Sequence, residues 1–111
     1  MDMSLITINK KEEGEFILNS KRRAYLRGQA MTMDCIIHVG KSGVTPEITE
    51  SIREALEARE LIKINVLKNC LDDVSSVASM LGDRTQSEVI TVIGRKIVLF
   101  KQAKENSKYE E

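Results

Sequence analysis

The tetrad Gly40-Lys41-Ser42-Gly43 is the part of this sequence whose residue types and spacing could do chemistry. Glycines carry no side chain, so backbone N–H groups beside them can approach phosphate oxygens, and Lys41 adds a positive charge. Thr45 and the proline after it are typical of a helix start, whose positive N-terminal end would face the same point. The pattern is that of a Gly-x-x-Gly loop that clamps a nucleic-acid backbone. A plain turn between a strand and a helix is the equally weighted alternative.

A nucleotide-hydrolysing P-loop is a poorer fit to the same residues. That motif reads Gly-x-x-x-x-Gly-Lys-Ser, and the run Gly40-Lys41-Ser42 supplies its last three positions. The first glycine would have to stand at position 35, which is a cysteine. The sequence therefore disfavours nucleotide hydrolysis, and a domain that binds a small nucleotide or phospholigand through this loop remains an alternative.

Two groups of basic residues accompany the tetrad, namely Lys21, Arg22, Arg23 and Arg27 in one and Arg95 and Lys96 in the other. Arg23 and Arg27 stand one helical turn apart, so they could bracket a phosphate. The whole chain has 17 basic and 17 acidic residues and no net charge. Residues 1–19 carry two lysines against four acidic residues and residues 103–111 carry two against three, so the segment 20–102 has a net charge of +3. Whole-chain neutrality therefore does not exclude a nucleic-acid partner.

Acidic side chains dominate the polar face of the segment that follows Pro46, and these are Glu47, Glu50, Glu54, Glu57 and Glu60. This face would repel a phosphate backbone, so only the first turn of the helix can meet nucleic acid. The same face supports a second alternative, a protein-interaction adaptor that docks through its acidic helix.

The sequence offers little for catalysis or metal binding. Its single histidine, His38, is predicted to lie on the surface of a strand, and Cys35 and Cys70 are too far apart for a metal-binding knuckle. No serine stands in a nucleophile elbow. We therefore expect a protein that is not an enzyme and has no cofactor or metal, with Cys35 in the core and Cys70 at the end of a strand.

Hydrophobic periodicity and turn signals predict seven elements in the order α-β-α-β-α-β-β. Gly82 is expected to stop the third helix, and Gly94-Arg95 suits a type II′ hairpin turn. The predicted fold is a single α/β domain over 20–102, with a four-stranded mixed sheet and helices packed on it, between tails at 1–19 and 103–111. The expected helices span about 21–31, 46–59 and 74–81, and the expected strands span Cys35–Val39, Leu61–Leu67, Val89–Ile93 and Ile97–Phe100.

Aromatic residues are scarce, since Tyr25 and Phe100 are the two inside the predicted domain. The predicted sheet has no aromatic pair on which bases could stack, so recognition of structured RNA through phosphates and shape fits better than reading of a single strand. No apolar run approaches the roughly 20 residues of a membrane span, and the N-terminus has no signal-peptide pattern. We expect a cytoplasmic protein, with a monomer favoured.

Four ordered motifs resemble the CRM domain, the family of chloroplast RNA splicing and ribosome maturation proteins, in its bacterial stand-alone YhbY type. The resemblance implies an RNA-binding α/β domain similar in fold to the C-terminal domain of translation initiation factor three. It also implies association with ribosomal RNA in precursors of the large ribosomal subunit, with Gly40 to Gly43 as the RNA-contacting loop; plant relatives serve in group II intron splicing. The motifs are Lys21-Arg22-Arg23-Ala24-Tyr25-Leu26-Arg27 with Val39-Gly40-Lys41-Ser42-Gly43-Val44-Thr45, Glu60-Leu61-Ile62-Lys63, Leu67-Lys68-Asn69-Cys70, and Ile93-Gly94-Arg95-Lys96-Ile97-Val98-Leu99-Phe100.

Overall fold

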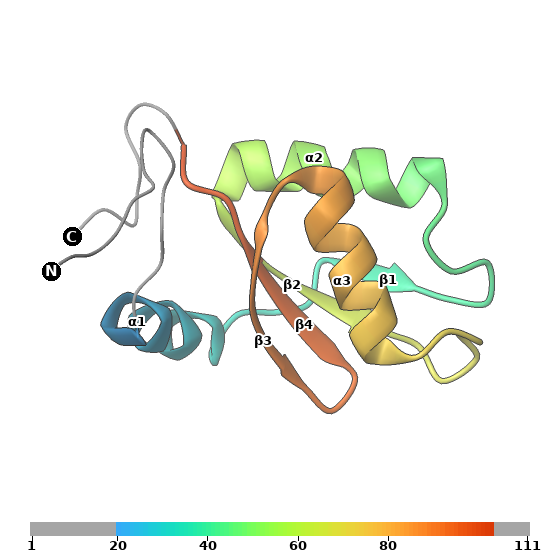
Figure 1. Cartoon of the computed structure of the whole chain (residues 1–111), viewed down its shortest axis with the longest axis horizontal. Coiled ribbons are helices and arrows are strands. Elements are labelled where there is room, and N and C mark those ends of the chain that lie inside the picture. Colours follow the sequence, from blue (N-terminus) through green and yellow to red (C-terminus); the bar gives the residue numbers. More distant parts are fainter. Residues whose placement is uncertain (1–19, 104–111) are drawn as a thin grey trace, which may run out of the picture.

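Residues 20–103 are described by the computed structural model, in which a four-stranded sheet lies between helices (Figure 1). The predicted order α-β-α-β-α-β-β is confirmed. The predicted tails, 1–19 and 103–111, lie outside the described residues apart from Ala103. The elements are α1 Ser20–Ala30, β1 Ile37–Val39, α2 Pro46–Arg59, β2 Leu61–Val66, α3 Val74–Thr85, β3 Glu88–Ile93 and β4 Lys96–Phe100.

The sheet is mixed, as predicted, and its strands lie in the order β1-β2-β4-β3. Strands β1 and β2 pair in parallel, with Val39 beside Val66. Strand β4 pairs antiparallel with both β2 and β3 and therefore separates them. Because β1 and β2 run in the same direction, the loops that follow them leave the sheet at the same edge. That shared edge positions the candidate site.

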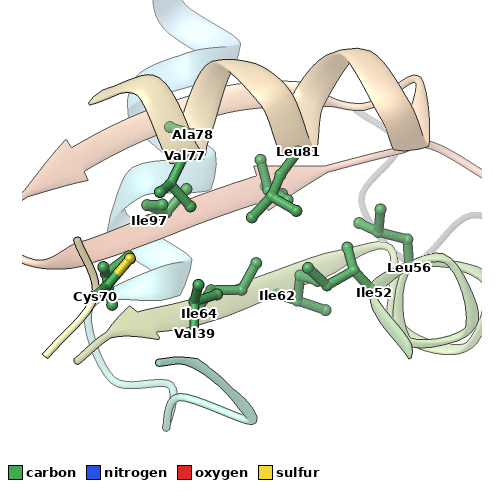
Figure 2. Close-up of a cluster of buried hydrophobic side chains, with 12 residues drawn as sticks. Val39, Ile52, Leu56, Ile62, Ile64, Cys70, Val77, Ala78, Leu81 and Ile97 are labelled. Carbon is green, nitrogen blue, oxygen red and sulfur yellow. The ribbon is translucent and has the colours of Figure 1, made fainter. Parts of the chain in front are cut away.

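Helices α2 and α3 cover one face of the sheet and enclose the larger core. Apolar side chains recur on one side of each helix at intervals of three or four residues, and they meet the alternate residues of the strands that point to the same face. Each fully buried aliphatic side chain of this kind stabilises the fold by roughly 1.5–3 kcal/mol. Figure 2 shows these side chains converging between sheet and helices: Val39, Ile52, Leu56, Ile62, Ile64, Cys70, Val77, Ala78, Leu81 and Ile97.

Helix α1 lies on the opposite face of the sheet, where it packs over a smaller cluster. Leu26 and Ala30 are its buried residues in this cluster, and they contact the region where β2 begins and β4 ends. The partners from the sheet are Leu61, Ile90, Val98 and Phe100. Helix α1 therefore covers only part of this face.

Two predictions about element ends are wrong. Gly82 does not stop α3, which continues to Thr85 and ends at Gln86 in the left-handed conformation. A Cβ atom on Gly82 would lie 3.1 Å from Val89 Cγ2 and 3.3 Å from the Ser87 carbonyl, so this glycine permits a close approach between α3 and the start of β3. Strand β1 begins at Ile37 rather than Cys35, which is half-buried.

Other local predictions are confirmed. Gly94 has a φ of 60° and Arg95 does not have a positive φ, which is the pattern of a type II′ turn. Thr45 caps α2, because its side chain accepts a hydrogen bond from the Ile48 N–H. His38 is exposed on the sheet face that α2 and α3 do not cover.

Candidate nucleic-acid interface

The tetrad forms a tight turn between β1 and α2. The Gly43 N–H donates to the Gly40 carbonyl oxygen at 3.0 Å, which closes a four-residue β-turn with Lys41 and Ser42 at its exposed tip. Neither tip residue has a positive φ, whereas Gly43 has a φ of 71°. A residue with a Cβ is strained at that φ, so the turn depends on a glycine at its last position.

The two glycines of the turn have different surroundings. A Cβ atom on Gly43 would stand 2.9 Å from Asp72 Oδ2, and Gly43 is buried although the tip is exposed. A Cβ atom on Gly40 would meet Asn69 and Leu67 side-chain atoms at 3.6 Å, which is ordinary contact. Within the protein, Gly43 is therefore the glycine whose surroundings leave no room for a side chain, and the approach of a phosphate to either glycine stays a prediction.

The backbone N–H groups of Lys41 and Ser42 donate no hydrogen bond within the described residues. Together with the Lys41 ammonium and the Ser42 hydroxyl they place several donors on one exposed tip. These donors suit the oxygens of a phosphate group. They have no acceptor among the described residues, so binding a phosphate breaks no hydrogen bond within this part of the protein.

The N-terminus of α2 contributes less to this site than its sequence suggests. Pro46 has no N–H, the Ile48 N–H is capped by Thr45 Oγ1 at 3.1 Å, and the Thr49 N–H bonds the Thr45 carbonyl at 3.0 Å. The Glu47 N–H remains as a donor at this helix end, but the side chain of the same residue is a carboxylate, which repels an anion. The donors for an anion therefore belong mainly to the turn.

A second loop, 67–73 between β2 and α3, lies beside the turn, and both loops leave the same end of the molecule (Figure 1). Arg95 braces this loop from the β3–β4 hairpin, because its Nε donates to the Val66 carbonyl at 2.8 Å and its Nη2 to the Leu67 carbonyl at 2.6 Å. Lys68 is exposed in the same loop. Sequence reasoning missed Lys68 and Asp72, since nothing in the linear spacing brings them to the turn.

Two of the four basic residues predicted on α1 hold the fold together. Arg22 is only 5% exposed, and its guanidinium lies over the Phe100 ring at 5.9 Å from the centroid. Arg23 Nη1 donates to the Val89 carbonyl at 2.7 Å and to the Ile90 carbonyl at 3.3 Å, at the point where β3 bulges. Arg23 therefore already donates to main-chain acceptors of β3, and its predicted pairing with Arg27 around a phosphate stays a prediction.

The remaining predicted cations are exposed and make no hydrogen bond or ion pair within residues 20–103. Lys41 lies at the tip of the turn, and Lys96 follows the hairpin on β4. The side chain of Arg27 borders the sheet face beside α1. These free cations are Lys21, Arg27, Lys41 and Lys96.

The acidic face of α2 differs from its prediction in one residue. Glu60 does not belong to it: the residue is 3% exposed, has a φ of 68°, and its carboxylate accepts the Ala103 N–H at 2.7 Å. Its place at the tight junction between α2 and β2 explains this burial. The exposed acidic residues of the helix are Glu47, Glu50, Glu54 and Glu57.

Within the described residues, no helix is long and apolar enough to cross a membrane. The same part of the chain contains no group of three or more histidine, cysteine, aspartate or glutamate side chains placed to hold a metal ion.

Comparison with known proteins gives one family and several relatives. A model of the CRS1 / YhbY (CRM) domain family matches residues 18–101. "Probable RNA-binding protein YqeI" of Bacillus subtilis is 44% identical over 94 residues, which cover 85% of this chain and 98% of that protein. A probable RNA-binding protein of Methanocaldococcus jannaschii is 34% identical over 100 residues, which cover 88% of this chain and 74% of that protein.

A solved structure also matches this fold. It is the solution structure of a Staphylococcus aureus protein described as a candidate RNA-binding protein, with a TM-score of 0.73 and 40% identity. The match covers 85% of this chain and 98% of that one.

Proposed function

The chain belongs to the CRS1 / YhbY (CRM) domain family, and from this membership we propose that it binds structured ribosomal RNA during assembly of the large ribosomal subunit. The proposed contact is the Gly40–Gly43 turn, with Lys21, Arg27 and Lys96 as further cationic contacts. The protein acts by binding and not as an enzyme, and it acts as a monomer in the cytoplasm. The names of the relatives support the RNA part of this proposal, because each describes RNA binding.

The observation that carries the proposal is the exposed tip of the turn. The N–H groups of Lys41 and Ser42 have no acceptor among residues 20–103, and a lysine and a hydroxyl stand on the same two residues. A phosphate oxygen satisfies these donors, and the Lys41 charge displaces counterions from the RNA. Binding of this kind reads the backbone and its shape rather than base sequence.

The charge distribution fits an RNA that approaches from the turn and the α1 side of the sheet. The acidic side chains of α2 are exposed on the other side of the sheet and repel a phosphate backbone. Asp72 brings a carboxylate close to Gly43 and weakens the attraction locally. Together these charges restrict the orientation in which RNA can dock.

The experiment that tests RNA binding compares two lysine-to-alanine variants by fluorescence anisotropy with a structured ribosomal RNA fragment across a salt series. Lys41→Ala removes one phosphate contact, so affinity falls a few-fold and the log–log salt slope shrinks by about 0.7–0.9. Lys101→Ala is the control, because Lys101 is also an exposed lysine but follows β4 at the end of the sheet where β2 begins, away from the end that carries the turn. Equal effects of the two changes would show that the turn is no special contact.

The ribosomal part of the proposal is tested by sedimentation of cell extract through a sucrose gradient. We expect the protein to travel with immature large-subunit particles, and Lys41→Ala to shift it towards the top of the gradient. Presence only among free proteins at low salt contradicts a role in subunit assembly. Binding that depends little on RNA length favours the small-phospholigand alternative instead.

A further inference from the structure

A row of side chains crosses the sheet on the face that α1 covers only in part. His38 lies beside Asn65 in the parallel pair, Asn65 lies opposite Lys96, and Lys96 lies opposite Ile93. Residues paired in register share a face, so the row runs across all four strands, and neighbouring strands about 4.8 Å apart give it a length of roughly 14 Å. It begins two residues before Gly40 and so adjoins the turn.

The row is accessible. His38, Lys96 and Ile93 are exposed, with Ile93 at 63%, and Asn65 is half-buried. The Asn65 side-chain Nδ2 lies 3.4 Å from His38 Nδ1, so the two side chains support each other through a hydrogen bond. The Asn65 side-chain Oδ1 accepts no hydrogen bond within residues 20–103, so it can pair with the edge of a nucleobase.

A small hollow lies at the far end of this row, where α1 meets the sheet. Its volume is about 210 Å³, below the roughly 300–1,000 Å³ of sites for whole small molecules, so it fits a single ring. Apolar and cationic side chains make up nearly all of its lining and none of the lining residues is acidic: Arg27, Ala30, Met31, Lys63, Thr91, Ile93 and Val98.

The cations at the hollow have different tasks. Lys63 Nζ donates to the Ala30 carbonyl at 3.1 Å and to the Met33 carbonyl at 3.3 Å, and it thereby closes the C-terminal end of α1. Arg27 makes no hydrogen bond or ion pair within residues 20–103, so its planar guanidinium is available. Guanidinium planes stack on nucleobases, and apolar side chains provide the surface below.

We propose that this hollow takes one unpaired nucleobase of an RNA whose backbone lies along the row from the turn. The proposal rests on the RNA binding proposed above and extends it from phosphate contact to the capture of a base. Charge complementarity selects RNA over an apolar peptide, because the lining of the hollow includes Arg27 and Lys63 and no carboxylate. Lys96, which pairs in register with the lining residue Ile93, adds a third cation beside it. The target is then a structured RNA with a bulged or flipped-out nucleotide.

Two RNAs of equal length and charge test the idea: a hairpin with one bulged uridine in its stem, and a fully paired hairpin in which that uridine is moved into the loop. We expect the full-length protein to bind the bulged RNA about tenfold more tightly. Ile93→Ser removes apolar contact without changing charge, and it should lower affinity for the bulged RNA about fivefold, as expected for losing one or two buried methylene groups. Affinity for the paired hairpin and both salt slopes should stay unchanged.

Val92→Ser is the matched control, because Val92 is the neighbouring residue on β3, is 37% exposed and points to the opposite face. It should alter neither affinity. Equal binding of the two RNAs by the parent protein, or an equal loss for both in Ile93→Ser, overturns the base-binding hollow while leaving the phosphate turn standing. Failure to bind either RNA contradicts the proposed function itself.

A measurement on the parent protein tests the same proposal without any substitution, so it does not depend on whether a variant folds. With 4-thiouridine at the bulge, ultraviolet crosslinking followed by peptide mass spectrometry should place adducts within 27–31 or 91–93. Adducts confined to 40–45 would overturn the proposal, because the bulged base would then lie at the turn.

Discussion

Helix α1 and the Gly40–Gly43 turn both bring positive charge to this domain, but they use it differently. The helix has the larger number of basic residues, yet Arg22 is buried over Phe100 and Arg23 is bonded to the carbonyl groups of β3. The turn has one lysine, and both that side chain and the backbone donors beside it are free within the described residues. The difference teaches that the number of basic residues in a segment does not measure the charge it can offer to a ligand.

The difference has a physical cause in the sheet. Strand β3 is an edge strand with a bulge between Val89 and Thr91, so its ladder leaves carbonyl groups without regular partners. Arg23 supplies donors to these carbonyls from α1 and also pairs with Glu88 at 3.4 Å. The turn meets no such demand, because its one internal hydrogen bond already closes it.

The largest effect is expected from placing a carboxylate at the last position of the turn. Gly43→Asp combines a φ of 71° with the proximity of Asp72, so we expect a loss of about 2 kcal/mol in unfolding free energy and roughly a 10 °C fall in Tm. RNA affinity should fall tenfold or more, because a negative charge then stands at the phosphate site. Thermal melting and anisotropy measure the two effects.

The control is Gly40→Asp, which adds the same charge at a position without a positive φ and with ordinary contacts for a Cβ. It should weaken RNA binding while changing Tm by only a degree or two, on the order of 0.3 kcal/mol. An equal drop in Tm for both variants would remove the asymmetry between the two glycines. Full RNA affinity in folded Gly43→Asp would move the binding site away from the turn.

The next effect separates the structural from the free arginines of α1. Arg23→Ala removes charge-assisted hydrogen bonds to two carbonyl groups, and we expect the unfolding free energy to fall by about 1.5 kcal/mol, because the guanidinium is only partly buried. Arg27→Ala removes an exposed side chain without partners in residues 20–103, so its effect on stability should stay within about 0.5 kcal/mol. Urea unfolding compares the two.

RNA affinity should show the reverse order. Arg27→Ala is expected to weaken binding and to reduce the salt slope by about 0.7–0.9, whereas folded Arg23→Ala should change the slope less. A reduced salt slope of RNA binding in Arg23→Ala, together with an unchanged unfolding free energy, would contradict this distinction. It would show that Arg23 is available to RNA in the same way as Lys41 of the turn.

The smallest effect concerns the carboxylate beside the turn. Asp72→Asn removes a negative charge next to Gly43 and keeps the size of the side chain, so RNA affinity should rise about two- to threefold, consistent with a solvent-screened interaction below about 1 kcal/mol. Asp83→Asn is a suitable control, because Asp83 is exposed near the other end of α3. An equal gain in both variants would indicate a general charge effect rather than a local one.

Several features of this domain were predictable because they depend on neighbours in the chain. Thr45 before Pro46 fixes the start of α2, and alternation over Leu61–Val66 fixes a buried strand. The Gly94-Arg95 pair likewise fixes the sharp hairpin through the positive φ of its glycine. Such signals come from backbone preferences and from the periodicity of helix and strand, so the sequence alone contains them.

The sequence by itself determined the elements, their order and the tetrad, whereas the tertiary structure decided which charged groups remain available. Arg23 donates a hydrogen bond to a carbonyl group of β3, and the Asp72 carboxylate lies close to Gly43. Both contacts join segments that are far apart in the chain. Gly82, which resembles a helix stop, instead permits β3 to approach α3. Hydrogen bonds and close contacts of this kind depend on three-dimensional neighbours, and linear spacing does not specify those neighbours.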